Sequence, residues 1–562
     1  MRLKISKSPN AASLYVIKST YEHGKHSSKI VEKLGTVKEL TKKLNGQDPI
    51  EWAKKHIEEL NQKEREENRE VIVKYSPAKI IAKGEQRSFN GGYLFLQQIY
   101  YKLGLNNVCN KISRKYKFTF NLNSILSRLV YARIIYPSSK LATFQLSKRF
   151  IEQPDFELQH VYRVLEIVAR EGDFIQSSLY NNSLKISKRN TGVLYYDCTN
   201  YFFETEQEEG LKQYGVSKEH RPNPIVHMGL FMDGDGIPLA FDIDKGNTNE
   251  QLTLKPLEKK ILSDFNLSKF IVCTDAGLAS DGNRKFNNKG ERAFITAQSI
   301  KKLKINLKKW ALDPGGWSLA DNGTYDITKL DEDKDRDKIF HKERWIKENG
   351  LEQRIVVTYS IKYRNYQRMI RNSQVERAQK VIDFNPGKLK KYNSNDYKRF
   401  IEKDHCTAEH YSINTELISK EEAFDGFYAV CTNLEDNASE IIRVNKRRWE
   451  IEECFRIMKS EFKARPVYLS RDDRIKAHFT TCFISLVIYR LLEKKLNRKY
   501  TCREIINGLR DMNFFEAKGD GYIPAYARTD FTDDLHETFG FRTDYQIVST
   551  SQMKKILKST KS

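Results

Sequence analysis

The sequence predicts an α/β fold in which helices cover a mixed sheet. Between residues 191 and 277, an apolar run, a hairpin pattern, a helical pattern and a β-branched run follow one another. Residues 90–185 before this segment are mainly helical, and residues 278–434 after it contain polar loops and strand-like pieces. We therefore expect an α/β core that is preceded by a helical region and interrupted by a strand-rich insertion.

The charge balance of the chain favours a polyanionic partner. The 562 residues include 97 Lys and Arg against 74 Asp and Glu, which gives a formal net charge of +23. A surplus of this size attracts polyanions, although it does not separate DNA from RNA or from an anionic membrane. With 30% charged and 39% hydrophobic residues, the composition is that of a soluble globular protein rather than a disordered one.

Neither a membrane anchor nor a secretion signal is predicted. The longest apolar run, "FTTCFISLVIYRLL", is shorter than the roughly 18 residues of a membrane span, so we expect a buried helix. The N-terminal "MRLKISKSPN" lacks the apolar segment of a signal peptide. The eight cysteines are scattered without a CxxC pair, which indicates reduced cysteines and argues against a zinc site. We therefore expect a cytoplasmic protein without a membrane partner.

The N-terminal half is expected to contain two regions. Residues 1–75 read as short strands, "SLYVIKS" and "SSKIVEKLG", followed by a charged helix. Residues 76–185 are a candidate DNA-binding region, in which a helix over 121–136 ends at Pro137 and "SSK" offers an N-cap for the next helix. Two basic helices joined by a tight turn permit a helix-turn-helix, and an ordinary helical hairpin explains the pattern at least as well.

The core begins in residues 186–284. The segment "TGVLYYDCTNYFFE" is strand-like up to Asp197, and "IVHMGLFMDGDGIPLAFDID" reads as two strands around an Asp-Gly turn. A helix over 253–265 and a β-branched strand that ends at Asp275 follow. We expect a strand-rich insertion over residues 285–434, the rest of the core over 435–500, and a candidate dimerisation region over 501–562.

A charged helix with the sequence "RRWEIEECFRIMKSEFKARP" lies in the second part of the core. Its apolar residues Ile451, Cys454, Phe455 and Met458 recur at the spacing of one helical face, which should pack on the core. Arg448, Glu452 and Lys459 project within roughly 40° of one another along one border of this face, and Glu450 and Glu453 point elsewhere. Taken alone, the pattern is that of an i,i+4 ion pair worth a few tenths of a kcal/mol.

Three carboxylates could nevertheless form a metal site. Asp197 and Asp275 each end an apolar strand, where a charge is costly unless a partner neutralises it, although either one alone reads as a capping residue. If the helix packs on this sheet, Glu452 reaches the same edge. Three hard oxygen ligands suit Mg²⁺ or Mn²⁺, and two such ions roughly 4 Å apart would clamp a phosphodiester. Arg448 and Lys459 would then hold phosphates.

These residues resemble a known catalytic pattern. Asp197, Asp275 and Glu452 are similar to the triad of the DDE transposases, whose catalytic domain has the ribonuclease-H-like fold. The helix resembles the Tyr-x2-Arg-x3-Glu-x6-Lys signature of the bacterial insertion-sequence branch called the IS-four group, with Arg448, Glu452 and Lys459 in place. The segments "YYDCTNYFFE", "GNTNE" and "CTDAGLAS" resemble the same branch, and the resemblance extends from about residue 190 to about residue 495.

The resemblance implies a set of DNA contacts, and the sequence departs from the family signature at one position. Asn445 stands where the signature has a tyrosine that helps to grip a terminal phosphate. Our candidate DNA contacts on this part of the chain are Arg448, Lys459, Asn445 and Trp449. In this branch a β-rich insertion before the glutamate holds DNA, sometimes with an aromatic ring that receives a flipped base. The insertion tryptophans, for which a core position is the simpler interpretation, are Trp310, Trp317 and Trp345.

The resemblance implies an insertion-sequence transposase that binds terminal inverted repeats, cleaves there with two Mg²⁺ or Mn²⁺ ions, and joins the freed 3′-hydroxyl to target DNA. Its partners would be double-stranded DNA and a second copy of the chain, since two ends must be joined, and it would act at the cytoplasmic nucleoid. The alternatives are a stand-alone structure-specific nuclease on the same fold, and a DNA-binding relative that has lost catalysis.

Overall fold

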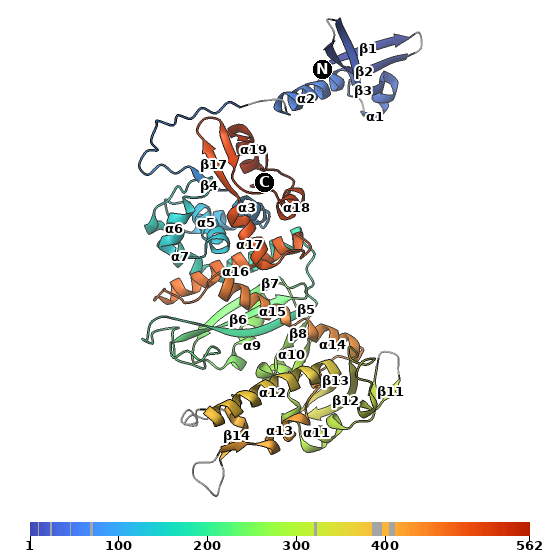
Figure 1. Cartoon of the computed structure of the whole chain (residues 1–562), viewed down its shortest axis with the longest axis vertical. Helices are drawn as coiled ribbons and strands as arrows, with labels where there is room; N and C mark the ends of the chain where they lie inside the picture. Colours follow the sequence, from blue (N-terminus) through green and yellow to red (C-terminus); the bar gives the residue numbers. More distant parts are fainter. Residues whose placement is uncertain are drawn as a thin grey trace. The chain divides into compact units, whose positions relative to one another are not determined.

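The chain forms two compact units (Figure 1). The computed structural model describes residues 1–8, 11–22, 25–44, 47–67, 71–319, 323–384, 396–403 and 411–562. The first unit comprises Met1–Glu85 with Ala517–Asp520, and the second comprises Gln86–Glu516 with Gly521–Ser562.

The first unit is a three-stranded antiparallel sheet with two helices. The strands, in the order β1-β2-β3, are β1 (Arg2–Ser8), β2 (Ala11–Glu22) and β3 (Lys25–Thr36), and the helices are α1 (Val37–Lys43) and α2 (Pro49–Glu67). Leu14, Leu40 and Ala53 are buried together in a small core. The strands and the charged helix that the sequence predicts for this region are confirmed.

The second unit begins with a layer of helices. After the short strand β4 (Ser88–Asn90) come α3 (Tyr93–Lys102), α4 (Leu105–Lys115), α5 (Leu122–Ile135), α6 (Lys140–Ser147), α7 (Leu158–Arg170) and α8 (Gly172–Ile186). The predicted break between α5 and α6 is confirmed, because Ser139 caps α6 by accepting a hydrogen bond from the Ala142 N–H at 3.2 Å.

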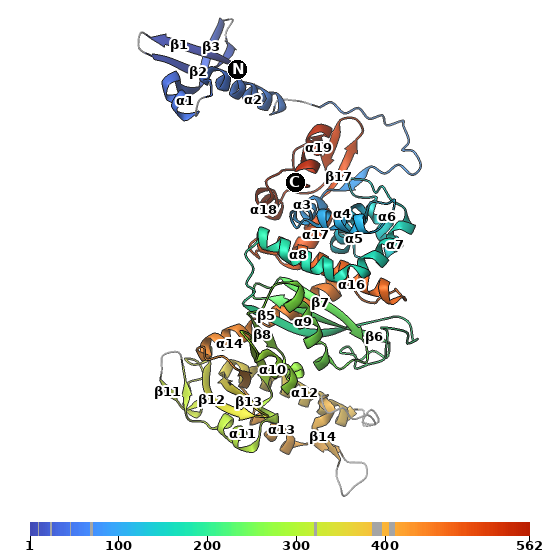
Figure 2. The same cartoon turned by 180° about the vertical axis from the view of Figure 1, so that it is seen from behind.

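The long helix α16 (Asp472–Lys495) joins this helical layer to the central sheet. It contacts α3, α5 and α7 and also β7 of the sheet, and both views show it between the two layers (Figures 1 and 2). Within the described residues it is the one helix long and apolar enough to cross a membrane, and 94% of its apolar window is buried inside the unit. This is the position of a core helix, as the sequence predicts.

The central sheet has ten strands in the order β11-β10-β12-β13-β16-β9-β8-β5-β6-β7. Its first half in the chain is β5 (Val193–Phe202), β6 (Ile225–Asp233), β7 (Pro238–Lys245), β8 (Ile271–Thr274) and β9 (Ala293–Gln298), with α9 (Leu254–Asp264) and α10 (Asp281–Asn287). β5, β6 and β7 are antiparallel, whereas β8 pairs parallel with β5 and β9 pairs parallel with β8. This arrangement is consistent with a ribonuclease-H-like fold.

The strands of the expected insertion continue the same sheet. They are β10 (Trp317–Ser318), β11 (Thr324–Tyr325), β12 (Phe340–Glu348), β13 (Leu351–Tyr359) and β16 (Phe427–Thr432), and β16 pairs directly with β9. The helices are α11 (Ile305–Leu312), α12 (Ile361–Phe384) and α13 (Thr415–Glu422), and β14 (Ile401–Lys403) and β15 (Tyr411–Ile413) form a separate pair. β9, which the predicted boundary at 285 assigns to the insertion, is therefore a strand of the core arrangement.

The C-terminal segment returns to the helical layer. After β16 come α14 (Ala438–Lys446), α15 (Trp449–Arg456) and a π-helical turn (Ile457–Glu461), and after α16 come α17 (Cys502–Asp511), β17 (Asn513–Ala517), β18 (Gly521–Pro524), α18 (Asp530–Phe539), β19 (Val548–Ser549) and α19 (Thr550–Ser559). β17 pairs antiparallel with β4, so the ends of the second unit share one sheet.

Candidate active site

Two aspartates lie on neighbouring strands where β8 ends. Tyr196 of β5 pairs with Thr274, the last residue of β8. Asp197 and Asp275 follow directly on these parallel strands, so they stand at the same level of the sheet. The prediction that β8 ends at Asp275 is confirmed. β5 does not end at Asp197 but continues to Phe202, because it keeps its partner β6 over its whole length.

The two carboxylates differ in their surroundings. Asp197 accepts a hydrogen bond from the Cys198 N–H at 2.7 Å, and Asp275 accepts one from the Ala276 N–H at 2.6 Å. The pKa of Asp197 is raised to about 6, mainly by burial and also by the charge of Asp275, although the nearby cations Lys218 and Arg448 act against the shift. An added cation beside Asp197 would stabilise its charged form.

Arg448 links the helix α15 to this pair. It occupies the N-cap position of α15, and its Nη1 lies 3.4 Å from Oδ1 of Asp275. The charges of Asp275 and Asp197 both act on its guanidinium, whose pKa is raised although burial alone would lower it. Arg448 is therefore positioned between the helix and the aspartates.

Lys459 lies in the same region, but not at the helical spacing that the sequence suggests. α15 ends at Arg456, and Lys459 belongs to the π-helical turn, in which each turn contains more residues than in an α-helix. Its Nζ lies 3.3 Å from Oε1 of Glu219 and 5.5 Å from the ring centre of Tyr201. Burial lowers the pKa of Lys459 to about 8, with Lys218 adding to the shift and Asp197 opposing it.

Glu452 is not gathered with the two aspartates. It lies on α15 with an exposed side chain, and within the described part of the chain its carboxylate has no hydrogen bond or ion pair. Among the described residues no group of three acidic, histidine or cysteine side chains is close enough to hold a metal ion. The structure thus brings together Asp197, Asp275 and Arg448, and leaves Glu452 one turn away on the helix.

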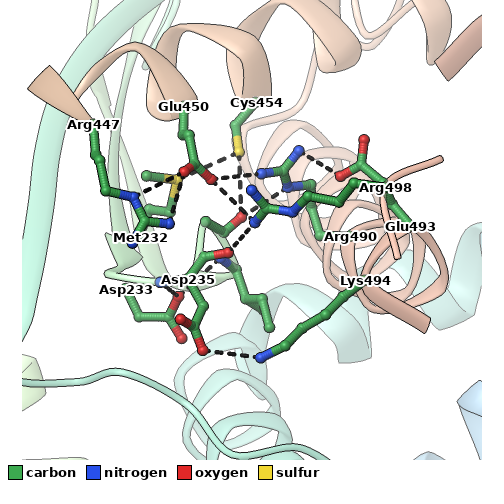
Figure 3. A network of polar contacts seen from close by, with 12 residues as sticks. Met232, Asp233, Asp235, Arg447, Glu450, Cys454, Arg490, Glu493, Lys494 and Arg498 are labelled. Atoms are coloured by element: carbon green, nitrogen blue, oxygen red, sulfur yellow. Dashed lines mark hydrogen bonds and ion pairs between the residues drawn. The ribbon is translucent and has the colours of Figure 1, made fainter. Parts of the chain in front are cut away.

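The buried acid of α15 is Glu450, which the periodicity of the sequence does not indicate (Figure 3). Glu450 is 2% exposed, and its carboxylate accepts hydrogen bonds from Arg447 at 2.9 Å, Arg490 at 3.1 Å and Arg498 at 3.2 Å. Arg490 also donates to the carbonyl of Gly236 at 2.8 Å. This network fastens α15 to α16 and to the β6–β7 turn, and so sets the position of the helix that carries Arg448.

Asn445 contacts a tyrosine that the sequence analysis did not single out. Its Nδ2 donates to the hydroxyl of Tyr428 at 3.2 Å, and Tyr428 comes from β16. The charges of Arg448 and Asp275 both influence the Tyr428 hydroxyl, whose pKa is raised mainly by burial. A phenol is therefore present beside the site although the signature position holds Asn445, and only the pairing of β16 with β9 could have indicated it.

The four candidate tryptophans differ in exposure. Trp317 is fully buried, donates from Nε1 to the Asp313 carbonyl at 2.9 Å, and lies under Lys342, whose Nζ is 4.6 Å from its ring centre. Trp310 is partly buried against the same cluster. Trp345 and Trp449 are 44% and 59% exposed. Trp317 and Trp310 thus have core positions, and Trp345 and Trp449 offer ring surface to a partner.

The aspartate pair fits a divalent cation by its chemistry. Carboxylate oxygens are preferred ligands of Mg²⁺ and Mn²⁺, and Asp197 and Asp275 present two carboxylates from adjacent strands. The pKa of Asp197, raised by burial to about 6, marks a carboxylate whose negative charge is incompletely balanced. These two residues are therefore the part of the expected metal site that the geometry supports.

A comparison with family models identifies the family of the chain. The sequence model of the transposase DDE domain family matches residues 201–488, a segment that includes Asp275, Arg448 and Glu452 and begins four positions after Asp197. No curated protein matches the chain in a sequence search. Among solved structures, the chain is similar to the piggyBac transposase in a cryo-EM synaptic complex with hairpin DNA, at 7% identity and a TM-score of 0.36, with 84% of each chain covered. The family match spans more than half of the chain, and the protein belongs to the transposase DDE domain family.

Proposed function

We propose that the protein is the DNA transposase of an insertion sequence, which binds the terminal inverted repeats, cleaves DNA at these ends and transfers the freed strand to a target. The observation that supports this most directly is the pair Asp197 and Asp275 on adjacent parallel strands, with Arg448 3.4 Å from Asp275. The net charge of +23 favours a partner as anionic as DNA. Family membership supports the transposase activity itself.

In this proposal each polar residue of the site has a separate task. Asp197 and Asp275 would hold the metal, and Glu452 from α15 would be the third ligand. When bound, two Mg²⁺ or Mn²⁺ ions would supply the Lewis acidity that phosphodiester cleavage requires. Arg448 would release Asp275 and bind a phosphate oxygen, for which the guanidinium has a suitable donor geometry. Lys459 would exchange Glu219 for phosphate in the same way.

The proposal also assigns DNA contacts to residues other than the three carboxylates. Asn445 and Tyr428 would contact a phosphate together, since the amide donates to the phenol at 3.2 Å. Trp449 and Trp345, the exposed rings, would stack on bases, which is worth about 1–3 kcal/mol per base. The region 76–185 would contribute to the recognition of the ends, and two copies of the chain would hold two ends in the cytoplasmic nucleoid.

A cleavage assay with candidate end DNA tests the proposal. Labelled DNA is incubated with Mg²⁺ or Mn²⁺, and the products are resolved by strand. Asp197→Asn, Asp275→Asn and Glu452→Gln should each lower cleavage by roughly 10²-fold or more, because a metal ligand contributes several kcal/mol to the transition state. Glu453→Gln is the matched control on the same helix and should cleave at the wild-type rate. Wild-type cleavage by any of the three variants would remove that residue from the site.

Two observations favour a second candidate function. Glu452 lies outside the aspartate pair, and Asn445 replaces the signature tyrosine, as expected of a DNA-binding relative without catalysis. Such a protein would bind DNA without cleaving it under any metal. A stand-alone nuclease would cleave without dependence on the end sequence and without strand transfer, so the same assay separates the three functions.

A further inference from the structure

A pocket lined by cations lies between the helical layer and the segment that follows the π-helical turn. Its volume is about 450 Å³, and it is bounded by the α5–α6 turn on one side and by Lys463–Leu469 on the other. Arg133, Lys140, Lys463 and Arg465 line it, and its described lining contains no carboxylate. A cavity with four basic side chains and no acidic one is suited to an anion.

Lys140 is one of two buried cations that line this pocket, and Arg133 is the other. Lys140 is the first residue of α6 and is 5% exposed, and within the described residues its ammonium group has no hydrogen bond or ion pair. Burial lowers its pKa to about 7, and the charge of Arg133 adds to this shift. Burying an ammonium group without a partner destabilises the folded protein. A lysine at this position therefore indicates an anionic ligand that pairs with it.

The backbone around Lys140 also favours an anion. Lys140 stands at the N-terminus of α6, where free N–H groups and the helix dipole place partial positive charge. Arg133 is held against the same wall by donating to the carbonyls of Phe462 at 3.1 Å and Ser138 at 3.0 Å, and its Nε has no partner in the described structure. His478 faces the pocket in its neutral form, because burial holds its pKa well below the usual range.

The pocket adjoins the candidate active site through one shared acid. Glu219 forms an ion pair with Arg465 of the pocket and lies 3.3 Å from the Nζ of Lys459. A DNA strand that passes Lys459 would therefore bring a neighbouring phosphate to the mouth of the pocket. We propose that this pocket binds a backbone phosphate of the DNA that flanks the cleavage site, with Lys140 as its central cation. The choice of DNA over a free phosphate rests on the proposed function.

Replacing Lys140 by methionine tests this site, because Met keeps the apolar stem and removes the charge. Binding of duplex DNA is measured from 50 to 200 mM salt without divalent metal. In Lys140→Met, the slope of log K against log salt should fall by about 0.9, the value for one phosphate. Lys259→Met on the exposed side of α9 is the matched control and should keep the wild-type slope, because no DNA contact is proposed for it. An unchanged slope in Lys140→Met would overturn the proposal.

A second measurement covers the case in which Lys140→Met folds poorly. Wild-type protein is titrated with duplexes in which single phosphates are replaced by neutral methylphosphonates. Binding should weaken most at one position near the cleavage site, and a uniform response across all positions would contradict a discrete phosphate pocket. If inorganic phosphate raises the Tm of wild type but not of Lys140→Met, and the DNA slope is the same in both, the pocket binds free phosphate and the DNA assignment is wrong.

These outcomes are independent of catalysis. Because binding is measured without metal, a protein that cleaves no DNA can still show the loss of slope in Lys140→Met. Conversely, a fully active transposase can show an unchanged slope. The salt dependence of binding therefore tests the phosphate pocket, and the cleavage assay tests the proposed function, so the failure of one proposal can be told from the failure of the other.

Discussion

At the scale of single residues, the acids of α15 have opposite environments. Glu450 is buried among Arg447, Arg490 and Arg498, whereas Glu452 two positions later is exposed. The sequence predicts the apolar face of this helix correctly, since Ile451, Cys454 and Phe455 are buried. It gives no indication that Glu450 is buried, because two of the three arginines that neutralise it, Arg490 and Arg498, come from α16 and the turn after it, far along the chain.

The Glu450 network should contribute strongly to stability. Glu450→Gln removes one of the two carboxylates that compensate buried Arg490, the other being Glu493, and breaking a buried ion pair from one side costs about 3 kcal/mol. The free energy of unfolding from urea titration should fall by about that amount. Glu453→Gln, which breaks only the partly exposed pair with Arg456, should change it by less than about 0.5 kcal/mol. Equal effects of the two substitutions would contradict the structural role of Glu450.

Lys140 should make stability depend on pH in a defined direction. Its pKa is about 7 in the folded protein against the ordinary 10.5, so between these values the unfolded chain binds more protons and stability rises with pH. Burial holds the pKa of His478, which faces Lys140, well below the usual 6.5, and burial raises that of Cys482. The other ionisable groups that line the pocket are present both in wild type and in a Lys140 variant, so a comparison of the two proteins isolates Lys140; they are Arg133, Tyr162, Lys463 and Arg465.

Lys140→Met should therefore unfold at a higher Tm than wild type at pH 7, without phosphate or DNA. The advantage should shrink steadily as the pH rises through 10.5, above which the wild-type lysine is neutral in both states. Thermal unfolding of both proteins across this range measures the difference. A constant difference at all pH values would mean that the Lys140 side chain is charged and paired throughout.

At the scale of elements, the sequence predicts correctly those features that depend on residues close together in the chain. The N-cap of α6 at Ser139, the β6–β7 hairpin, the end of β8 and the buried helix α16 all follow from residues within a few positions of each other. The π-helical turn after Arg456 does not, so Lys459 departs from the regular α-helical spacing that the prediction assumed. A turn of this kind depends on packing against the core rather than on local periodicity.

The β6–β7 turn should be sensitive to the loss of one glycine. Gly236 has φ +80°, and a Cβ there would lie 2.0 Å from Oε2 of Glu450 and 2.4 Å from Nη2 of Arg490. Gly236→Ala should thus destabilise the protein by about 2 kcal/mol more than Gly290→Ala, which has φ +66° but no atom within 4 Å of the added methyl group. Chemical denaturation of both variants checks this. Equal costs would show that backbone strain alone determines the effect.

At the scale of the whole molecule, the sequence predicts which kinds of region the fold contains better than it predicts how distant regions pair with one another. The helical region, the α/β core and the strand-rich segment are all present. The pairing of β16 with β9 and of β17 with β4 joins segments that are 130 or more residues apart, and no local pattern encodes such partners. For the same reason the approach of Tyr428 to Asn445 could not be predicted.

The division into two units leads to a prediction about folding. A fragment that begins at Gln86 keeps every strand of the central sheet and the whole of the helical layer. Its unfolding transition should have the same Tm as that of the larger unit in the full chain, within about 2 °C. Calorimetry of both proteins tests this. A fragment without a cooperative transition would show that residues 1–85 are required for folding of the larger unit.

The ten-stranded sheet has a mechanical consequence for the strand-rich segment. Adjacent strands are held by ladders of backbone hydrogen bonds, and these run without interruption from β12 through β13, β16 and β9 to β8, whose end carries Asp275. A displacement of Trp345 on β12 is therefore transmitted to the aspartates through the hydrogen-bonded sheet, because no hinge interrupts the ladders between these strands. The strand-rich segment and the aspartates therefore keep a fixed spacing. Under the proposed function, in which both contact the same DNA, the DNA is the component that must bend to reach both.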